Sequence, residues 1–184
     1  MMNKVLYGII LISFISCKTN QTKFKKIKIL GNQVEISIPD DWKNNDTLIH
    51  FADEDNKLIN EAYYGKGFMY NRIFVSHEKS IASINNLSLV LKTELESYNW
   101  KQPDCVIYNR DSKIDIKENT ITINTFGEFH NRQENQRRFL YNSTFIIVYP
   151  NEIFYFYING TNSIKSKEKV DRIIKSIKII KSSF

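Results

Sequence analysis

The clearest pattern along the chain is an alternation of hydrophobic and polar residues, which has the period of a strand with one buried face. It is strongest in residues 27–39, where two alternating runs flank Gly31-Asn32, a pair that suits the tight turn of a β-hairpin. Pro39 ends the second strand because it has no backbone N–H to donate. Trp42, three residues later, is expected to fold back over the sheet edge. The buried face of this hairpin is predicted to hold Ile27, Ile29, Val34, Ile36 and Ile38.

Further strands are expected on both sides of a central helix. The turn at Pro150-Asn151-Glu152 is short, so the last two strands are predicted to pair antiparallel. Strand composition, rich in Ile, Val, Thr, Tyr and Phe, marks residues 47–51, 68–77, 106–108, 120–129, 138–149 and 153–158.

Two segments have the helical spacing of hydrophobic residues instead. Residues 83–98 are predicted to form a helix capped by Ser83, with Leu87, Val90, Leu91, Leu95 and Tyr98 on its apolar face. A closing helix is predicted to begin at a second cap, Ser166. Its apolar face would hold Val170, Ile173, Ile174 and Ile177, and Lys and Arg cover much of the rest.

The first residues read as an export signal. Lys4 precedes an apolar run, residues 5–15, which at roughly a dozen residues is too short for a bilayer of ~30 Å that needs about 20. Ser16 and Cys17 follow the run directly and resemble the lipobox of bacterial lipoproteins, although Phe14 stands where the usual box has an aliphatic residue. The resemblance implies cleavage before Cys17 and a lipid on its thiol. The alternative is an ordinary secretory signal with an incidental Cys17.

This interpretation divides the chain into a signal peptide (1–16), a lipidated tether (17–25) and a single domain (26–184). It also places the protein in the bacterial cell envelope. Because the residues just after Cys17 lack acidic side chains, an anchor facing the periplasm is favoured. With Cys17 lipidated, Cys105 has no partner for an internal disulfide, so the fold must rely on hydrophobic packing. Cys105 lies in a strand-like run and is expected to be a buried, inert thiol.

The net charge of +6 would suggest nucleic acid as a partner if the protein were cytosolic. For an exported chain it points instead to anionic headgroups or an acidic protein, and no nucleic-acid partner is expected.

No motif predicts catalysis. His50, His77 and His130 are far apart in the sequence and lack metal-ligand spacing, and the chain has neither a Gly-x-Ser-x-Gly elbow nor a Gly-rich phosphate loop. We therefore expect no catalytic residue, metal or cofactor. A hydrolase would require the fold to bring His, Cys or carboxylate groups within hydrogen-bond reach.

The most charged local feature is the tip of a predicted hairpin at residues 129–138, which carries Arg132, Arg137 and Arg138. Guanidinium groups suit the recognition of carboxylates and phosphates, so this tip is a candidate contact surface for an acidic partner. The alternative is a solubilising loop whose charges keep a sheet edge from aggregating.

Several of these elements resemble PsbP-like domains. Val-Glu-Ile-Ser-Ile-Pro-Asp-Asp-Trp at 34–42 looks like the opening strand of that family, which ends in Pro and an aromatic residue. The helix from Ser83 fits their middle helix, and Val-Asp-Arg-Ile-Ile-Lys-Ser-Ile at 170–177 is similar to their closing helix. The resemblance covers about residues 26–180. It implies an α+β fold, a twisted antiparallel sheet of about six or seven strands with helices packed on its faces.

Members of that fold mostly bind other proteins or assist assemblies, and the fold also occurs in small bacterial lipoproteins. The resulting hypothesis is a lipid-anchored, non-enzymatic protein-binding module, such as an immunity protein or an accessory protein of a secretion or envelope system. The alternative is a binder of small apolar ligands, with a pocket between helix 83–98 and the sheet. Such a pocket would be lined by aromatic residues such as Phe145, Tyr149 and Tyr155.

Overall fold

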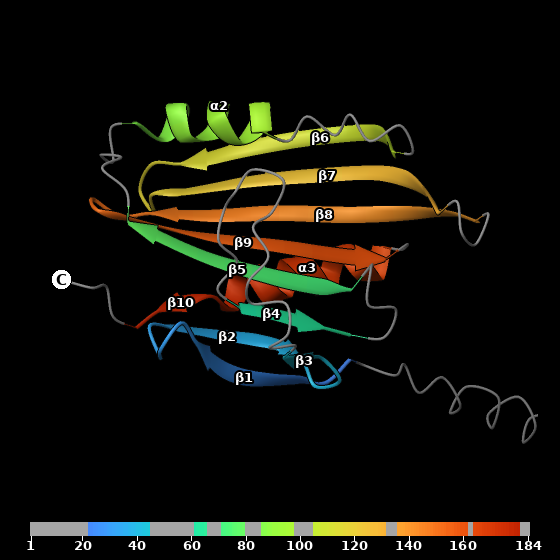
Figure 1. Ribbon diagram of the computed structural model, residues 1–184, viewed down its shortest axis with the longest axis horizontal. Helices are drawn as coiled ribbons and strands as arrows, with labels where there is room; N and C mark the ends of the chain where they lie inside the picture. Colours follow the sequence, from blue (N-terminus) through green and yellow to red (C-terminus); the bar gives the residue numbers. More distant parts are fainter. Residues whose placement is uncertain are drawn as a thin grey trace, which may run out of the picture.

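The computed structural model describes residues 22–44, 61–65, 71–79, 86–97, 105–131, 136–161 and 164–180. These residues form two antiparallel sheets and two helices, α2 (Leu87–Ser97) and α3 (Ile164–Ser176) (Figure 1). The small sheet has the order β1 (Phe24–Ile29), β2 (Val34–Pro39), β10 (Lys178–Ile179). The large sheet has the order β3 (Lys43–Asn44), β4 (Glu61–Tyr64), β5 (Arg72–Lys79), β9 (Glu152–Thr161), β8 (Gln136–Val148), β7 (Thr120–Asn131), β6 (Cys105–Asp115). This architecture confirms the predicted α+β class.

Strand β9 lies at the centre of the large sheet and is buried on both faces. Ile153, Tyr155 and Tyr157 join the hydrophobic cluster that contains Leu87 and Val90 of α2. The alternate residues Phe154, Phe156 and Ile158 join the cluster on the opposite face, which contains Val170 and Ile173 of α3. A strand covered on both sides needs apolar residues at every position, which explains the unbroken run Ile-Phe-Tyr-Phe-Tyr-Ile.

The predicted hairpin is present and forms most of the small sheet. Gly31 and Asn32 both have positive φ, 62° and 69°, inside a turn closed by Gln33 N–H donating to the Leu30 carbonyl at 3.2 Å. Ile29, Val34, Ile36 and Ile38 are buried, as the alternation predicted, and Ile27 is half-buried. Strand β1 begins at Phe24, before the first residue of the predicted hairpin.

Side-chain contacts join the small sheet to Trp42, to β4 and to α3. Trp42 is only 1% exposed, as its anchoring role predicted, and Lys25 Nζ donates to the Trp42 carbonyl at 2.7 Å. The Glu61 carboxylate on β4 accepts hydrogen bonds from the Leu30 N–H and the Tyr63 hydroxyl. On the other side, the Ser37 N–H of β2 donates to Ser176 Oγ of α3 at 2.8 Å. The small sheet is therefore held to the large sheet by polar groups as well as by the shared core.

Two local expectations need correction. Ser166 does not cap the closing helix: α3 begins at Ile164, and Ser166 is a buried helical residue packed against Gly160. Strand β6 is much longer than the predicted strand at 106–108, because an edge strand keeps its ladder on one side even where its side chains are polar. The predicted strand at 47–51 and the capping Ser83 lie outside the described residues.

The contact of Trp42 with Gly65 gives a stability prediction. A Cβ built on Gly65 would lie 2.3 Å from Trp42 Nε1, so Gly65→Ala must displace the indole. We expect a loss of about 1–3 kcal/mol in the free energy of unfolding, typical of overpacking. Urea unfolding measures the loss, and the emission of Trp42 in a Trp100→Phe background reports the displaced ring.

The control for this change is Gly31→Ala. A Cβ on Gly31 meets no atom within 4 Å, but the positive φ of 62° makes it strained. This variant should lose stability without changing the emission of Trp42. Unchanged stability and emission in Gly65→Ala would contradict the proposed contact.

Candidate protein-binding surface

Three aromatic side chains gather on one exposed face of the large sheet. The ring centroids of Tyr108 and Phe126 are 6.0 Å apart, those of Tyr108 and Phe139 6.2 Å, and those of Phe126 and Phe139 5.9 Å. The two Phe rings are stacked at 10°. Each residue remains largely exposed, 53% for Tyr108, 41% for Phe126 and 43% for Phe139. We call these three residues the aromatic patch.

The register of three strands creates the patch. Phe126 of β7 lies opposite Tyr141 of β8, and Glu128 lies opposite Phe139, so the two Phe residues are diagonal neighbours on one face. Strand β6 supplies Tyr108 at a register shift between Ile107 and Asn109. A β-bulge re-aims a side chain and bends its strand, and here it occurs at the residue whose ring meets both Phe rings.

Gly127 allows β6 to approach β7 at this point. A Cβ on Gly127 would lie 2.5 Å from the backbone oxygen of Val106, which is a contact that side chains do not make. A glycine is therefore needed at position 127, because two backbones approach each other closely beside a bulge.

A polar network borders the patch. The Tyr108 hydroxyl donates to Glu128 Oε2, and Arg137 Nε lies 3.4 Å from Glu128 Oε1. The hydrogen bond to Glu128 raises the pKa of Tyr108, with a further contribution from desolvation. The Glu128 side chain is 11% exposed, and its carboxylate already pairs with Tyr108 and Arg137. The Arg137 side chain, by contrast, is 78% exposed. The patch thus presents apolar rings beside an accessible guanidinium group.

Exposed hydrophobic residues are concentrated at this end of the sheet. Among the described residues, eight large hydrophobic side chains are exposed, and five of them lie on β6, β7 and β8 around the patch: Val106, Ile107, Tyr108, Phe126 and Phe139. Strand β6 is also an edge of the sheet, with its outer backbone not paired to another strand of the described chain. A clustered apolar surface next to an open edge is typical of an interaction site.

The structure places part of the Arg-rich hairpin next to the patch. Arg137 lies on β8 opposite His130 and forms the ion pair with Glu128. The backbone of Arg138 lies on β8 opposite Phe129, but its side chain is outside the described part of the structure. Arg132 and Cys17 lie outside the described residues, as does the Cys105 side chain.

The aromatic residues predicted to line a ligand pocket do not share a face. Phe145 and Tyr149 pack with Phe156 and Phe154 in the cluster on the α3 side, whereas Tyr155 packs in the cluster on the α2 side. The prediction is wrong for this set because the side chains of adjacent β9 residues point to opposite faces.

A His–carboxylate pair lies within hydrogen-bond reach in the described part of the chain. His77 Nε2 lies 2.7 Å from Glu152 Oε2, and its ring stacks on Phe154 with centroids 4.4 Å apart. His130 lies on β7, which is separated from the strand of His77 by β9 and β8. No group of three or more His, Cys, Asp or Glu that could hold a metal ion occurs among the described residues.

No helix in the described segments has the length and hydrophobicity needed to cross a membrane.

Comparison with known proteins shows the fold. No known family model matches the sequence, and neither does any curated protein. The chain is similar in structure to the cyanobacterial PsbP of Synechocystis sp. PCC 6803, with a TM-score of 0.50 and 9% identity over 89% of this chain and 97% of that one. This chain has the PsbP-like fold. It is also similar to the Ran-binding protein Mog1p of Saccharomyces cerevisiae, with a TM-score of 0.52 and 8% identity over 89% of this chain and 98% of that one.

The sequence prediction named Arg137 but none of the three residues of the aromatic patch. Phe126 and Phe139 have the alternation of any amphipathic strand, and the alternation does not reveal which face a helix will cover. The one local signal is Gly127, an isolated Gly within a strand pattern, which is typical of a bulge or a close backbone approach.

The Tyr141 hydroxyl, on the same sheet face, gives a pH prediction. Tyr141 is 9% exposed and its hydroxyl has no hydrogen-bond partner among the described residues. Burial, with the charges of Asp171 and Asp111, raises the pKa of Tyr141 from 10.0 to about 12. Because the pKa of Tyr141 is higher in the folded state than its value of about 10 in the unfolded state, the protonated hydroxyl stabilises the folded state below pH 10. This contribution is lost as the pH rises toward about 12.

We therefore compare wild type with Tyr141→Phe by urea unfolding at pH 7, 10 and 11. At pH 7 the variant should be as stable as wild type or more stable by about 1 kcal/mol, because it removes an unsatisfied buried group. Above pH 10 the difference should grow in favour of Tyr141→Phe. A constant difference across this pH range would contradict the raised pKa.

Proposed function

We propose that this protein is a lipid-anchored, non-enzymatic protein-binding module of the bacterial cell envelope. The observation that carries the proposal is the aromatic patch, an exposed cluster of three rings beside an accessible Arg137 and an open edge strand. Aromatic residues and Arg are the residue types enriched at the buried centres of protein interfaces.

The chemistry of the surface indicates the kind of partner. A protein that places an apolar side chain against the Phe126 and Phe139 rings would remove their remaining exposed area from water. Full burial of such a side chain is worth roughly 1.5–3 kcal/mol, so covering rings that are about half exposed contributes a part of this. A carboxylate on the partner would meet Arg137, and an extended segment could pair with the edge of β6.

The comparison with Mog1p supports a binding role by analogy, because a protein of the same fold is described as Ran-binding. Together with the export signal, this analogy favours an immunity protein or an accessory protein of a secretion or envelope system. The partner is then an exported or envelope protein.

The anchor is tested separately from the binding surface. We expect [³H]palmitate to label the wild-type chain in the producing bacterium and not Cys17→Ala, because Cys17 follows the apolar run of the signal directly. Cys105→Ala is the matched control and should be labelled as strongly as wild type. Equal labelling of Cys17→Ala and wild type would refute lipidation at this residue.

The binding surface is tested by Phe126→Ser combined with Phe139→Ser. Both residues are partly exposed on one sheet face, so the double variant should fold while losing the apolar contact. After crosslinking and detergent extraction, we expect the wild-type protein to recover an envelope protein in a stoichiometric amount. The double variant should recover at least tenfold less of this protein.

Leu89→Ser is the matched control, because Leu89 is an exposed apolar residue, 57% accessible, on helix α2, which packs against the opposite face of the large sheet. It should retain the partner fully. Failure to recover any stoichiometric partner with wild type, or equal recovery with all three proteins, would contradict the proposed binding surface.

A further inference from the structure

The net positive charge of the described residues comes from two segments. Residues 22–44 and 164–180 together contain eleven Lys and Arg against five Asp and Glu. All other described residues contain eight Lys and Arg against nine Asp and Glu. The first segment forms β1, β2 and β3, and the second forms α3 and β10. These elements therefore carry a net charge of +6, and the other described residues carry −1.

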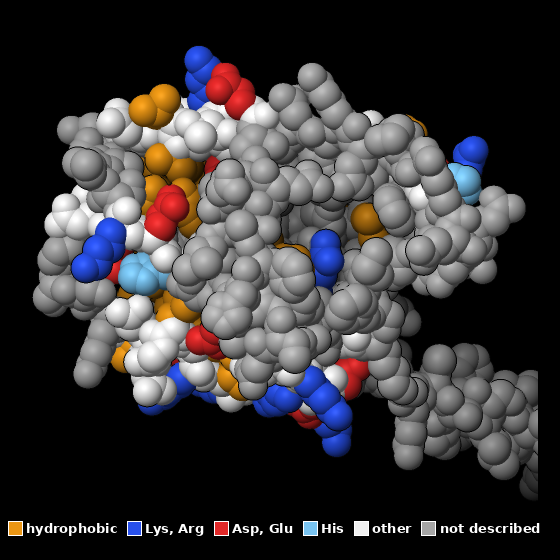
Figure 2. Space-filling model, in the orientation of Figure 1, with side chains coloured by type: hydrophobic (Ala, Val, Ile, Leu, Met, Phe, Trp, Pro, Cys, Tyr) orange, Lys and Arg blue, Asp and Glu red, His pale blue; other side chains and the backbone are white. Residues whose placement is uncertain are grey.

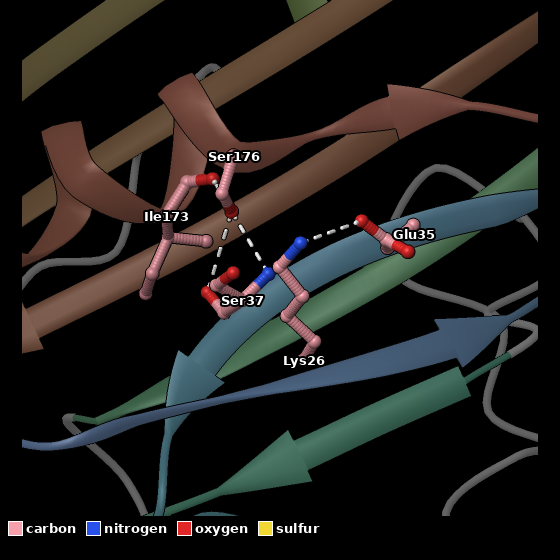
Figure 3. A network of polar contacts seen from close by, with 5 residues as sticks. All are labelled: Lys26, Glu35, Ser37, Ile173 and Ser176. Carbon is pink, nitrogen blue, oxygen red and sulfur yellow. Dashed lines mark hydrogen bonds and ion pairs between the residues drawn. The ribbon is translucent and has the colours of Figure 1, made fainter.

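The outer face of the small sheet carries part of this charge. Glu35 on β2 lies opposite Lys28 on β1 and opposite Lys178 on β10. A third lysine, Lys26, places its Nζ 3.3 Å from Glu35 Oε1 (Figure 3). Three lysines therefore surround one carboxylate, and an excess of positive charge remains on this face. The inner face, with Val34 and Ile36, is buried in the core.

Helix α3 continues this outer face. Ser176 Oγ accepts the Ser37 N–H at 2.8 Å and its hydroxyl donates to the Ile173 carbonyl at 2.6 Å, which fixes the end of α3 against β2 (Figure 3). The Arg172 guanidinium lies 4.1 Å from the ring centroid of Phe24 on β1. Arg172 and Lys175 are both exposed. We define the basic face as Lys26, Lys28, Lys178, Arg172 and Lys175.

The basic face differs chemically from the aromatic patch. Within residues 22–44 and 164–180 the structure records one exposed large hydrophobic side chain, Ile180. A protein interface normally buries an apolar centre, which the basic face lacks. Dispersed lysines without such a centre suit a diffuse negative surface, such as anionic phospholipid headgroups.

The basic face also lies close to the proposed anchor. Phe24, the first residue of β1, follows Cys17 by seven residues. A segment of this length spans at most roughly 25 Å when fully extended, so a lipid on Cys17 would keep β1 near the headgroups. Figure 2 shows Lys and Arg side chains along the lower border of the molecule, where Figure 1 places the small sheet.

We propose that the basic face lies against anionic phospholipid headgroups and orients the anchored domain on the membrane. The proposal rests on the lipid anchor of the proposed function. Strands β6, β7 and β8 lie on the far side of the large sheet from the small sheet (Figure 1). In this orientation the aromatic patch faces away from the membrane and toward a partner.

The test uses the mature lipidated protein, which begins at Cys17, reconstituted into vesicles of phosphatidylcholine alone or of phosphatidylcholine with about 30% phosphatidylglycerol, an anionic lipid. A membrane-impermeant amine-reactive ester labels lysines, and mass spectrometry reads each position. We expect Lys28, Lys175 and Lys178 to react several-fold more slowly on the anionic vesicles. Lys113 and Lys117, exposed at the distant end of the large sheet, should react equally on both. About 0.5 M NaCl should abolish the difference, because it shortens the screening length.

A triple variant, Lys28→Gln with Lys175→Gln and Lys178→Gln, should lose the remaining protection of Lys26 on anionic vesicles. The control Lys113→Gln with Lys117→Gln should retain it. Equal labelling on both kinds of vesicle would overturn the proposal, and so would protection that requires an added envelope protein.

Flotation with phosphatidylcholine vesicles reports the anchor alone. A chain that does not float with them, but whose lysines are protected on anionic vesicles, would contradict the anchor while supporting the basic face. A chain that floats with both and is labelled equally on both would support the anchor and refute the basic face.

Discussion

The burial of β9 on both faces is the constraint on which the rest of the structure depends. Its alternate residues form the centres of two separate cores, one under α2 and one under α3. Neither helix could be removed without exposing one side of this strand. Because β5 and β8 pair with its two edges over most of their length, the position of β9 also sets the register of the large sheet.

The small sheet depends on this core through a different kind of contact. Its inner aliphatic residues join the cluster on the α3 side, while Glu61 and Ser176 satisfy backbone groups at its turn and on its central strand β2. Trp42 fills the junction, where Gly65 leaves room for the indole. The charged outer face of the small sheet is thereby held in a fixed relation to α3, which lets lysines from distant parts of the sequence form one surface.

The two surfaces of interest have opposite compositions because they occupy different edges of the fold. At the β6 edge, aromatic rings remain exposed on the face that α3 covers farther along the sheet, and a bulge adds a third ring. At the small sheet, buried residues alternate with outward ones over most of β1 and β2, and the outward positions include Lys26, Lys28 and Glu35. An apolar site and a basic site on one domain can then serve two different partners.

The sequence by itself determined the hairpin at Gly31-Asn32, the burial of Trp42 and the antiparallel pairing of the last two strands, and its resemblance to PsbP-like domains implied the α+β class. The first three features depend on local periodicity and turn chemistry, which are set by residues that are neighbours in the sequence. Only the tertiary structure decided that Phe145 and Tyr155 face different cores, that Ser166 lies inside α3, and that Tyr108, Phe126 and Phe139 meet in the open. Alternation tells which residues share a face of a strand, but register and helix placement decide what covers that face.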